Sequence, residues 1–254
     1  MMDIIKALAS DIKNSNYIVA FTGAGHSAES GIPTYRGESG LWEKYDPNIY
    51  ANINYFLQDS SYYWNFFREL RYPLLMKAKP NKGHLALAEL EIMGKLKAVI
   101  TQNIDGLHQE AGSSSVIELH GTSKIIYCLN CAQEYSIDEV FSILDEELPP
   151  SCRKCKGKLR PAVVFFGESL DPSTLKSAYQ EAEKCDFLLA VGSSLVVHPA
   201  ADIPLRAKQR GAKLAIINKD PTPLDDIADY VINDEAGKTL SRILQILKSY
   251  SRKR

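Results

Sequence analysis

The chain has 254 residues, of which 45% are hydrophobic and 24% are charged, as in ordinary globular proteins. Its 30 Lys and Arg residues nearly balance its 31 Asp and Glu residues, so the net charge of −1 gives no electrostatic reason to expect binding to nucleic acids or membranes. No apolar stretch approaches the roughly 18 residues of a membrane span, and residues 1–16 lack the basic start and apolar run of a secretory signal. The sequence therefore indicates a soluble, cytoplasmic protein.

Short apolar runs that alternate with amphipathic stretches define the predicted elements. Residues 1–16 carry apolar side chains at helical spacing. The apolar runs lie at 17–22, 98–101, 187–191 and 213–217, and the helical patterns lie at 84–93, 173–184 and 200–210. Such runs are typical of strands buried on both faces of a parallel sheet. The alternation predicts an α/β fold, a Rossmann-like doubly wound parallel sheet.

Two segments interrupt this alternation. Residues 38–82 contain no strand-like run and are dense in aromatic side chains, and residues 123–159 contain four of the five cysteines. We expect a helical insertion and a four-cysteine zinc module, which together form a smaller lobe. The remaining segments, 1–37, 83–122 and 160–254, would form the larger domain around the parallel sheet.

A glycine loop follows the first predicted strand. Its sequence, Gly23-Ala24-Gly25-His26-Ser27-Ala28, fits the pattern G-x-G-x-x-A, in which glycines let backbone N–H groups approach a pyrophosphate at the start of a helix. Glycine turns after strands are common, and the acidic residue expected about twenty positions further on is missing. The loop therefore predicts dinucleotide binding only on a modified Rossmann sheet.

Four cysteines occur as two pairs. Cys128 and Cys131 are separated by two residues, as are Cys152 and Cys155, and twenty residues lie between the pairs. Thiolates at this spacing can close a tetrahedral zinc site. The alternatives are four buried thiols or two disulfides, and an intracellular chain disfavours the disulfides. Four protein ligands leave no position for water, so the predicted zinc ion is structural.

A polar loop and one histidine are the candidates for binding and catalysis. Gln102, Asn103 and Asp105 follow the second predicted strand, at the end of the sheet where α/β proteins bind ligands. Their side chains can recognise a carboxamide and sugar hydroxyls. His120 lies between the sheet and the cysteine module, where a cleft would form, so it is the candidate general base. The other four histidines are more simply explained as structural or site-lining residues.

These segments together resemble the sirtuin family over nearly the whole chain. The motifs that carry the resemblance are residues 23–36, 101–112, 120–121, the four paired cysteines, 161–168, 192–199 and 218–220. The resemblance, to the microbial type, implies an NAD-dependent deacetylase that removes acetyl or other neutral acyl groups from lysines of proteins or peptides. It implies a transferase reaction that releases nicotinamide and O-acetyl-ADP-ribose, with NAD as co-substrate and one structural Zn²⁺.

The resemblance also implies roles for individual residues of an NAD-binding domain. Gly23, Ala24, Gly25, Ser27 and Arg36 would meet the phosphates, Gln102 and Asn103 the nicotinamide ribose, Ile104 and Asp105 the carboxamide, and Gly192, Ser193 and Asn218 the adenosine half. His120 would be the general base. The peptide would lie as an extended strand against Gly167, Glu168, Val196, Val197 and His198, with Val164 and Phe166 lining the acyl-lysine tunnel.

Three positions depart from the family pattern. His26 stands where a small or aliphatic residue is usual, and Thr34 and Tyr35 replace the commoner Asp-Phe pair. The extra imidazole would lie near the phosphates, and the Tyr35 hydroxyl would lie on a ring that shields the nicotinamide pocket. We expect these changes to alter the kinetics more than the reaction.

The acyl preference is predicted from the aromatic insertion. Some sirtuins that prefer succinyl groups hold the extra carboxylate with a Tyr-x-x-Arg pair, and the best-matching register here puts Phe67 and Leu70 at those two positions. An unpaired carboxylate is costly in such an apolar pocket. We therefore expect acetyl to be preferred over succinyl, unless Arg68 or Arg71 turns inward.

Three other functions remain open on the sequence. A protein ADP-ribosyltransferase would use the same NAD cleavage and attach ADP-ribose to a protein. An NAD-dependent dehydrogenase, suggested by the glycine loop alone, would form NADH instead of nicotinamide. A zinc-ribbon binding module would retain DNA or peptide without NAD, although the balanced charge argues against it. Product masses from the protein, NAD and an acetyl-lysine peptide separate these functions.

Overall fold

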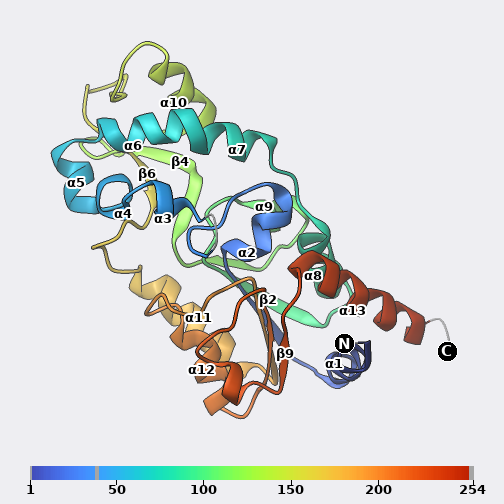
Figure 1. Ribbon diagram of the computed structural model, residues 1–254. Helices are drawn as coiled ribbons and strands as arrows, with labels where there is room; N and C mark the ends of the chain where they lie inside the picture. The colour runs from blue at the N-terminus through green and yellow to red at the C-terminus, as the bar shows by residue number, and fades with distance from the viewer. Residues whose placement is uncertain (1, 38–39, 252–254) are drawn as a thin grey trace.

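A six-stranded parallel sheet forms the centre of the larger part of the molecule (Figure 1). The computed structural model describes residues 2–37 and 40–251. The strand order is β3-β2-β1-β7-β8-β9. The strands are β1 (Ile18–Thr22), β2 (Leu96–Thr101), β3 (Val116–Glu118), β7 (Phe187–Val191), β8 (Lys213–Ile217) and β9 (Tyr230–Ile232). Every residue of β1 and β7 is buried, which confirms the prediction of a doubly wound sheet with both faces covered.

Helices cover both faces because the side chains of each central strand alternate between two apolar cores. Ile18 and Ala20 of β1 belong to one core, and Val19 and Phe21 belong to the other. The first core is completed by α1 (Met2–Asn14), α8 (Lys82–Ile92) and α13 (Ala236–Ser251), and the second by α11 (Pro172–Lys184) and α12 (Asp202–Gln209). The four predicted strands and three predicted interior helices are thus present, within a few residues of their expected bounds.

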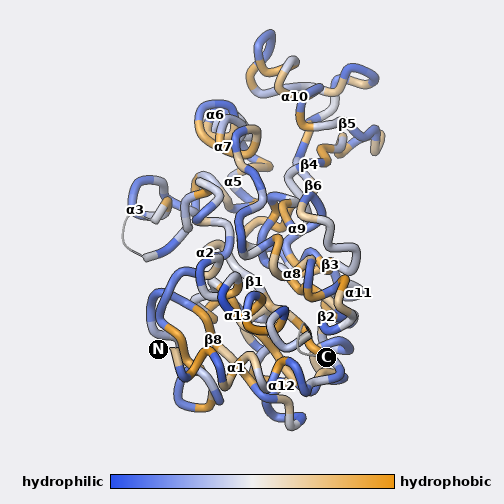
Figure 2. The backbone as a smooth tube through the Cα atoms, turned by 90° about the vertical axis from the view of Figure 1, so that its right-hand side faces the viewer, coloured by the Kyte–Doolittle hydropathy of each residue, from blue (hydrophilic) through white to orange (hydrophobic). Residues whose placement is uncertain are grey.

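The two interrupting segments form one smaller lobe. Its helices are α3 (Leu41–Lys44), α4 (Pro47–Tyr50), α5 (Ile53–Gln58), α6 (Ser61–Phe66), a π-helix (Phe67–Arg71), α7 (Tyr72–Lys77) and α10 (Ile137–Leu144), and its antiparallel sheet consists of β5 (Glu134–Ser136), β4 (Gly121–Cys128) and β6 (Leu159–Val163). Phe56, Trp64 and Phe67 pack with Ile126 and Leu159 in a common core. Figure 2 shows α10 and β5 at one end of the molecule and α12 at the other.

Several elements of the structure differ from the predicted ones. The edge strands β3 and β9 are only three residues long, and β4 and β6 extend across the predicted segment boundaries. The C-terminal helix α13 was not among the predicted elements, although it supplies Leu240 and Ile243 to the first core. Within the described ranges, no helix is long and apolar enough to cross a membrane.

Candidate active site

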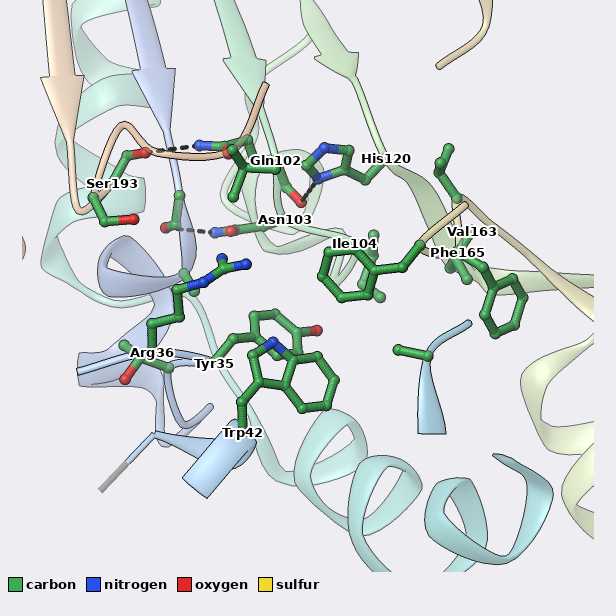
Figure 3. Close-up of a pocket in the computed structure, with 18 of the residues that line it drawn as sticks. Tyr35, Arg36, Trp42, Gln102, Asn103, Ile104, His120, Val163, Phe165 and Ser193 are labelled. Carbon is green, nitrogen blue, oxygen red and sulfur yellow. Dashed lines mark hydrogen bonds between the residues drawn. The ribbon is translucent and has the colours of Figure 1, made fainter. Parts of the chain in front are cut away.

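A cavity of about 700 Å³ lies where the carboxyl ends of the parallel strands meet the smaller lobe. Figure 3 shows Ser193 and Arg36 at one end of this cavity and Val163 and Phe165 at the other. The predicted residues that line it are Gly23, Ala24, Gly25, Arg36, Gln102, Asn103, Ile104, His120, Val164, Phe166, Gly167, Glu168, Gly192, Ser193, Val197, His198 and Asn218. Ser27 and Asp105 line a smaller adjoining cavity of about 40 Å³.

The glycines of the first loop allow two backbone segments to touch. A Cβ on Gly25 would lie 2.9 Å from the Cα of Gly192, and a Cβ on Gly23 would lie 2.8 Å from the Gly192 carbonyl oxygen. Gly25 N–H donates to that oxygen at 2.8 Å, and Gly192 itself has a φ of +62°, in the left-handed region. The loops after β1 and β7 therefore form one packed unit, on which a phosphate group could lie against the backbone.

Side-chain hydrogen bonds connect this unit to the polar loop after β2. Gln102 Nε2 donates to Ser193 Oγ at 2.8 Å (Figure 3). Asn103 Nδ2 donates to the Gly23 carbonyl and to Ser27 Oγ, both at 3.0 Å. Ser27 Oγ donates to Asp105 Oδ2 at 2.7 Å. Burial raises the pKa of Asp105, while hydrogen bonds from Leu107 N–H and Ser27 oppose that shift. Ser27 and Asp105 thus hold the loop that presents Asn103.

His120 is held with one nitrogen free to accept a proton. Its Nδ1 lies 3.0 Å from the Gln102 carbonyl oxygen, which can only accept a hydrogen bond, so the proton of the neutral ring is on Nδ1 (Figure 3). The other nitrogen, Nε2, then carries the lone pair. Burial lowers the pKa of His120 below its usual value, although the bond to Gln102 partly opposes this. A neutral imidazole in this tautomer is suited to general-base catalysis.

All but one of the residues predicted to bind the peptide lie on the wall of the large cavity. Val196 lines neither cavity and is 47% exposed. The backbone of Phe166 is already paired on one side, since its N–H donates to Ala51 and its carbonyl accepts from Ile53 N–H. Glu168 accepts two hydrogen bonds from the Arg160 guanidinium, at 2.8 and 2.9 Å, which fixes the turn at Gly167.

The structure contradicts the predicted register of the aromatic insertion. Phe67 is fully buried in the core of the smaller lobe, and Leu70 lines only the smaller cavity. Arg71 instead lines both cavities, and its Nη2 donates to the Tyr35 hydroxyl at 2.6 Å. Phe67, Leu70 and Arg71 all belong to the π-helix Phe67–Arg71, of which Arg71 is the last residue. The Tyr35 hydroxyl, a departure from the family pattern, is thereby explained as a partner of Arg71.

A cluster of three buried histidines lies beside the glycine loop that follows β1. Their rings contact one another, with centroids 4.4 to 5.0 Å apart, and come from His26, from His84 at the start of α8 and from His108 in α9 (Leu107–Glu110). Burial lowers the pKa of all three, to about 4 for His84 and about 3 for His108. Among residues 2–37 and 40–251, neither ring nitrogen of His26 has a hydrogen-bond partner. The sequence singled out His26 but gave no sign that the three rings meet.

The four paired cysteines come together in the smaller lobe. Their Sγ atoms all lie within 4.8 Å of one another, with Cys128–Cys155 at 3.5 Å and Cys131–Cys152 at 3.7 Å. A tetrahedral zinc site with Zn–S bonds of about 2.3 Å places its sulfur atoms about 3.8 Å apart. None of the cysteines forms a disulfide. The donor set therefore fits one Zn²⁺ bound by four thiolates.

Comparisons with known proteins agree with this arrangement. The model of the Sir2 family matches residues 23–199. An NAD-dependent protein deacetylase of Sulfurisphaera tokodaii is 50% identical over 236 residues, which cover 92% of this chain and 92% of that protein. The NAD-dependent protein deacylase 2 of Archaeoglobus fulgidus is 48% identical over 249 residues, 98% of each chain.

Solved structures of Sir2 proteins have folds similar to that of this chain. A Sir2 enzyme structure that addresses mechanism and regulation has a TM-score of 0.91 at 47% identity and covers 98% of this chain and 100% of that one. A Sir2 variant bound to a deacetylated p53 peptide and 3′-O-acetyl ADP-ribose has a TM-score of 0.91 at 39% identity, with 95% and 97% coverage. Both are similar to this chain over nearly their whole length.

Proposed function

The chain belongs to the Sir2 family and is an NAD-dependent protein deacetylase, and we propose that the cavity residues described above carry out the reaction. The enzyme removes acetyl groups from lysine side chains and releases nicotinamide and O-acetyl-ADP-ribose. The observation that supports the assignment of the base is the hydrogen bond between His120 Nδ1 and the Gln102 carbonyl. This bond leaves Nε2 unprotonated in a cavity that the nucleotide-binding loops also line.

The first group of roles concerns the binding of NAD. The acetyl oxygen attacks the ribose carbon of NAD that bears nicotinamide, and nicotinamide leaves. Backbone N–H groups of the packed glycine loops bind the phosphates, together with Arg36. Gln102 and Asn103 hold the nicotinamide ribose, and Ile104 lines the carboxamide pocket. Ser193 and Asn218 bind the adenosine half. Asp105 acts from the smaller cavity, through Ser27 and the loop that carries Asn103.

The second group of roles concerns proton transfer and the peptide. His120 Nε2 accepts the proton of the ribose hydroxyl that attacks the bound acyl carbon, and water then releases lysine. General-base help of this kind contributes about 10²–10⁴ in rate. Gly167, Glu168, Val197 and His198 bind the peptide backbone as an added strand, while Val196 contributes only at the surface. Val164 and Phe166 line the tunnel for the acyl-lysine.

The metal and the partners complete the proposal. The four paired cysteines hold one structural Zn²⁺, which joins the end of β4, where Cys128 lies, to the segment just before β6. The substrates are acetylated proteins or peptides, and we propose that the enzyme acts on them in the cytoplasm without binding nucleic acid or membranes. A Sir2 structure that contains a p53 peptide and NAD supports a peptide substrate.

One experiment tests the reaction and separates it from ADP-ribosylation. The protein is mixed with NAD and an acetyl-lysine peptide, and the products are identified by mass. Free nicotinamide, O-acetyl-ADP-ribose and a peptide lacking its acetyl group are expected. Transfer of ADP-ribose to peptide or protein, with the acetyl group retained, would identify the transferase instead.

A further inference from the structure

Arg71 joins the smaller lobe to the residue that precedes Arg36. Its Nη2 donates to the Tyr35 hydroxyl at 2.6 Å, and its guanidinium carbon lies 5.4 Å from the centre of the Tyr35 ring. Arg71 is the last residue of the π-helix, whereas Tyr35 lies in the segment between the glycine loop and α3. The contact therefore ties together two segments whose residues are 36 positions apart in the chain.

The hydroxyl of Tyr35 is what makes this contact possible. Among residues 2–37 and 40–251, the Arg71 side chain has no second hydrogen-bond acceptor and no ion-pair partner, and its Nε is buried without a partner. Arg160, which also lies against aromatic rings, instead donates to both oxygens of Glu168 and to the Val163 carbonyl. A phenylalanine at position 35 would leave the Arg71 guanidinium without this acceptor, which is costly for a charged group. Tyr35 and Arg71 therefore belong together as a pair.

A second set of contacts extends from Tyr35 to Trp42. The two rings stack with centroids 5.1 Å apart and an angle of 27° between their planes, and Trp42 N–H donates to the Tyr35 carbonyl at 3.0 Å. Figure 3 shows the rings side by side, next to Arg36. All these contacts are made within the protein, so they can hold Tyr35 with or without a bound nucleotide.

The position of Tyr35 relates this pair to NAD. Tyr35 and Arg71 line both cavities, as do Asn103 and Ile104. The Tyr35 ring thus borders the place proposed for nicotinamide, and Arg36, the next residue in the chain, borders the place proposed for the phosphates. A ligand binds more weakly when only a fraction of the protein is in the binding conformation. A contact that fixes Tyr35 at the cavity therefore strengthens the binding of NAD.

We propose that Arg71 is a positioning residue for NAD, because its hydrogen bond to Tyr35 holds the Tyr35 ring and Arg36 at the cavity and so keeps the NAD-binding conformation populated. The proposal rests on the deacetylase function described above. It concerns the affinity for NAD, and not the chemical step or the binding of the peptide. It also gives the hydroxyl at position 35, a departure from the family pattern, a function.

The test measures the NAD dissociation constant by calorimetry without peptide, and then the kinetics of deacetylation. In Tyr35→Phe and in Arg71→Met the dissociation constant should rise by about tenfold, the low end for a lost hydrogen bond to a charged group. The values of kcat and of KM for an acetyl-lysine peptide should stay within about twofold of the wild type. The double variant should bind NAD no more weakly than either single variant, because both changes remove the same contact.

Two further variants separate positioning from a general effect on the smaller lobe. Arg71→Lys keeps a charged donor, so its affinity for NAD should lie between those of the wild type and Arg71→Met. Arg68→Met is the matched control, since Arg68 donates to Asn65 and lines neither cavity, and its affinity for NAD should not change.

Three results would overturn the proposal: unchanged NAD affinity in Tyr35→Phe, losses that add in the double variant, or an equal rise of KM for the peptide in Arg71→Met. A wild-type protein that binds NAD but removes no acetyl group would contradict the deacetylase function instead. The dissociation constants would still test the contact between Arg71 and Tyr35 in that case, because they are measured without peptide.

Discussion

The two ends of the cavity satisfy their polar groups in different ways. At the phosphate end, defined by Gly23, Gly192 and Ser193, backbone loops touch and the side chains of the polar loop bond to one another. At the acyl end, defined by Tyr63, Arg71 and Phe165, buried polar atoms such as the Tyr63 hydroxyl and Arg71 Nε have no hydrogen-bond partner in the described part of the chain. Paired groups hold a site in shape, whereas unpaired groups of this kind are expected to meet a ligand.

Loss of zinc should have the largest effect, and it should affect the acyl end far more than the phosphate end. Cys128 and Cys152 belong to the same apolar core as Phe56 and Trp64, so the helices of the acyl end depend on the metal site. Structural zinc contributes about 10–16 kcal/mol of apparent binding energy in small modules. Cys152→Ser should reduce zinc from one ion to none per chain and remove hydrogen-exchange protection from the smaller lobe, while β1 and β7 keep theirs.

The matched control is Cys185→Ala, because Cys185 is a buried thiol outside the cysteine cluster. This variant should lose some stability through a small cavity but retain its zinc. Elemental analysis that finds no metal in active wild-type protein would contradict the zinc assignment.

Replacement of His120 should abolish catalysis while leaving the phosphate end intact. His120→Ala should lower kcat/KM for deacetylation by at least about 10²-fold, the low end for lost general-base help, and NAD should still bind. In the wild type, burial holds the pKa of His120 below 6.5, and the base acts in its neutral form. Activity should therefore rise with pH through that lowered pKa and be level near pH 7. Near-normal turnover by the variant would show that another group is the base.

The phosphate end could be predicted from the sequence because its chemistry lies in short motifs. Glycines in a loop after a strand, a polar loop after the next strand and His120 are adjacent in sequence to the strands that place them. A parallel sheet brings the carboxyl ends of its strands to one edge, so these residues line one cavity. The cysteine cluster could be predicted for the same reason, since two short spacings define it.

The acyl end could not be predicted because it depends on packing and on one irregular turn. The predicted register places Phe67 and Leu70 at the pocket, whereas the structure has a π-helix over residues 67–71 and Arg71 at the cavity wall. The histidine cluster was missed for a related reason. Its three members come from elements 24 to 82 residues apart in the chain, which only the tertiary fold brings together.

A methyl group on Gly25 tests the packing of the phosphate end with a smaller effect. In Gly25→Ala the Cβ would lie 2.9 Å from the Gly192 Cα, so the two loops must separate. Overpacking of this kind costs about 1–3 kcal/mol, and we expect NAD affinity to fall by roughly tenfold or more. Gly94→Ala is the control, because a Cβ there meets nothing within 4 Å and only its φ of +71° is strained. It should lower stability slightly and leave the NAD dissociation constant unchanged.

The smallest expected effect concerns the histidine cluster, which lies next to the phosphate end. Burial, and then the neighbouring His84 and His108, hold the pKa of His26 well below 6.5, so the folded state keeps the ring neutral. The unfolded chain binds a proton near pH 6.5, and stability is therefore full above that pH and falls as the pH drops toward the lowered pKa values. His26→Leu removes one of the three titrating rings while filling similar space. At pH 7 the variant should unfold at nearly the wild-type temperature, but between pH 6 and 4 it should lose less stability, as measured by urea unfolding at each pH. An identical pH dependence in the two proteins would mean that the cluster is already open to water, and the polar atoms of His26 would then be solvated instead of buried without partners.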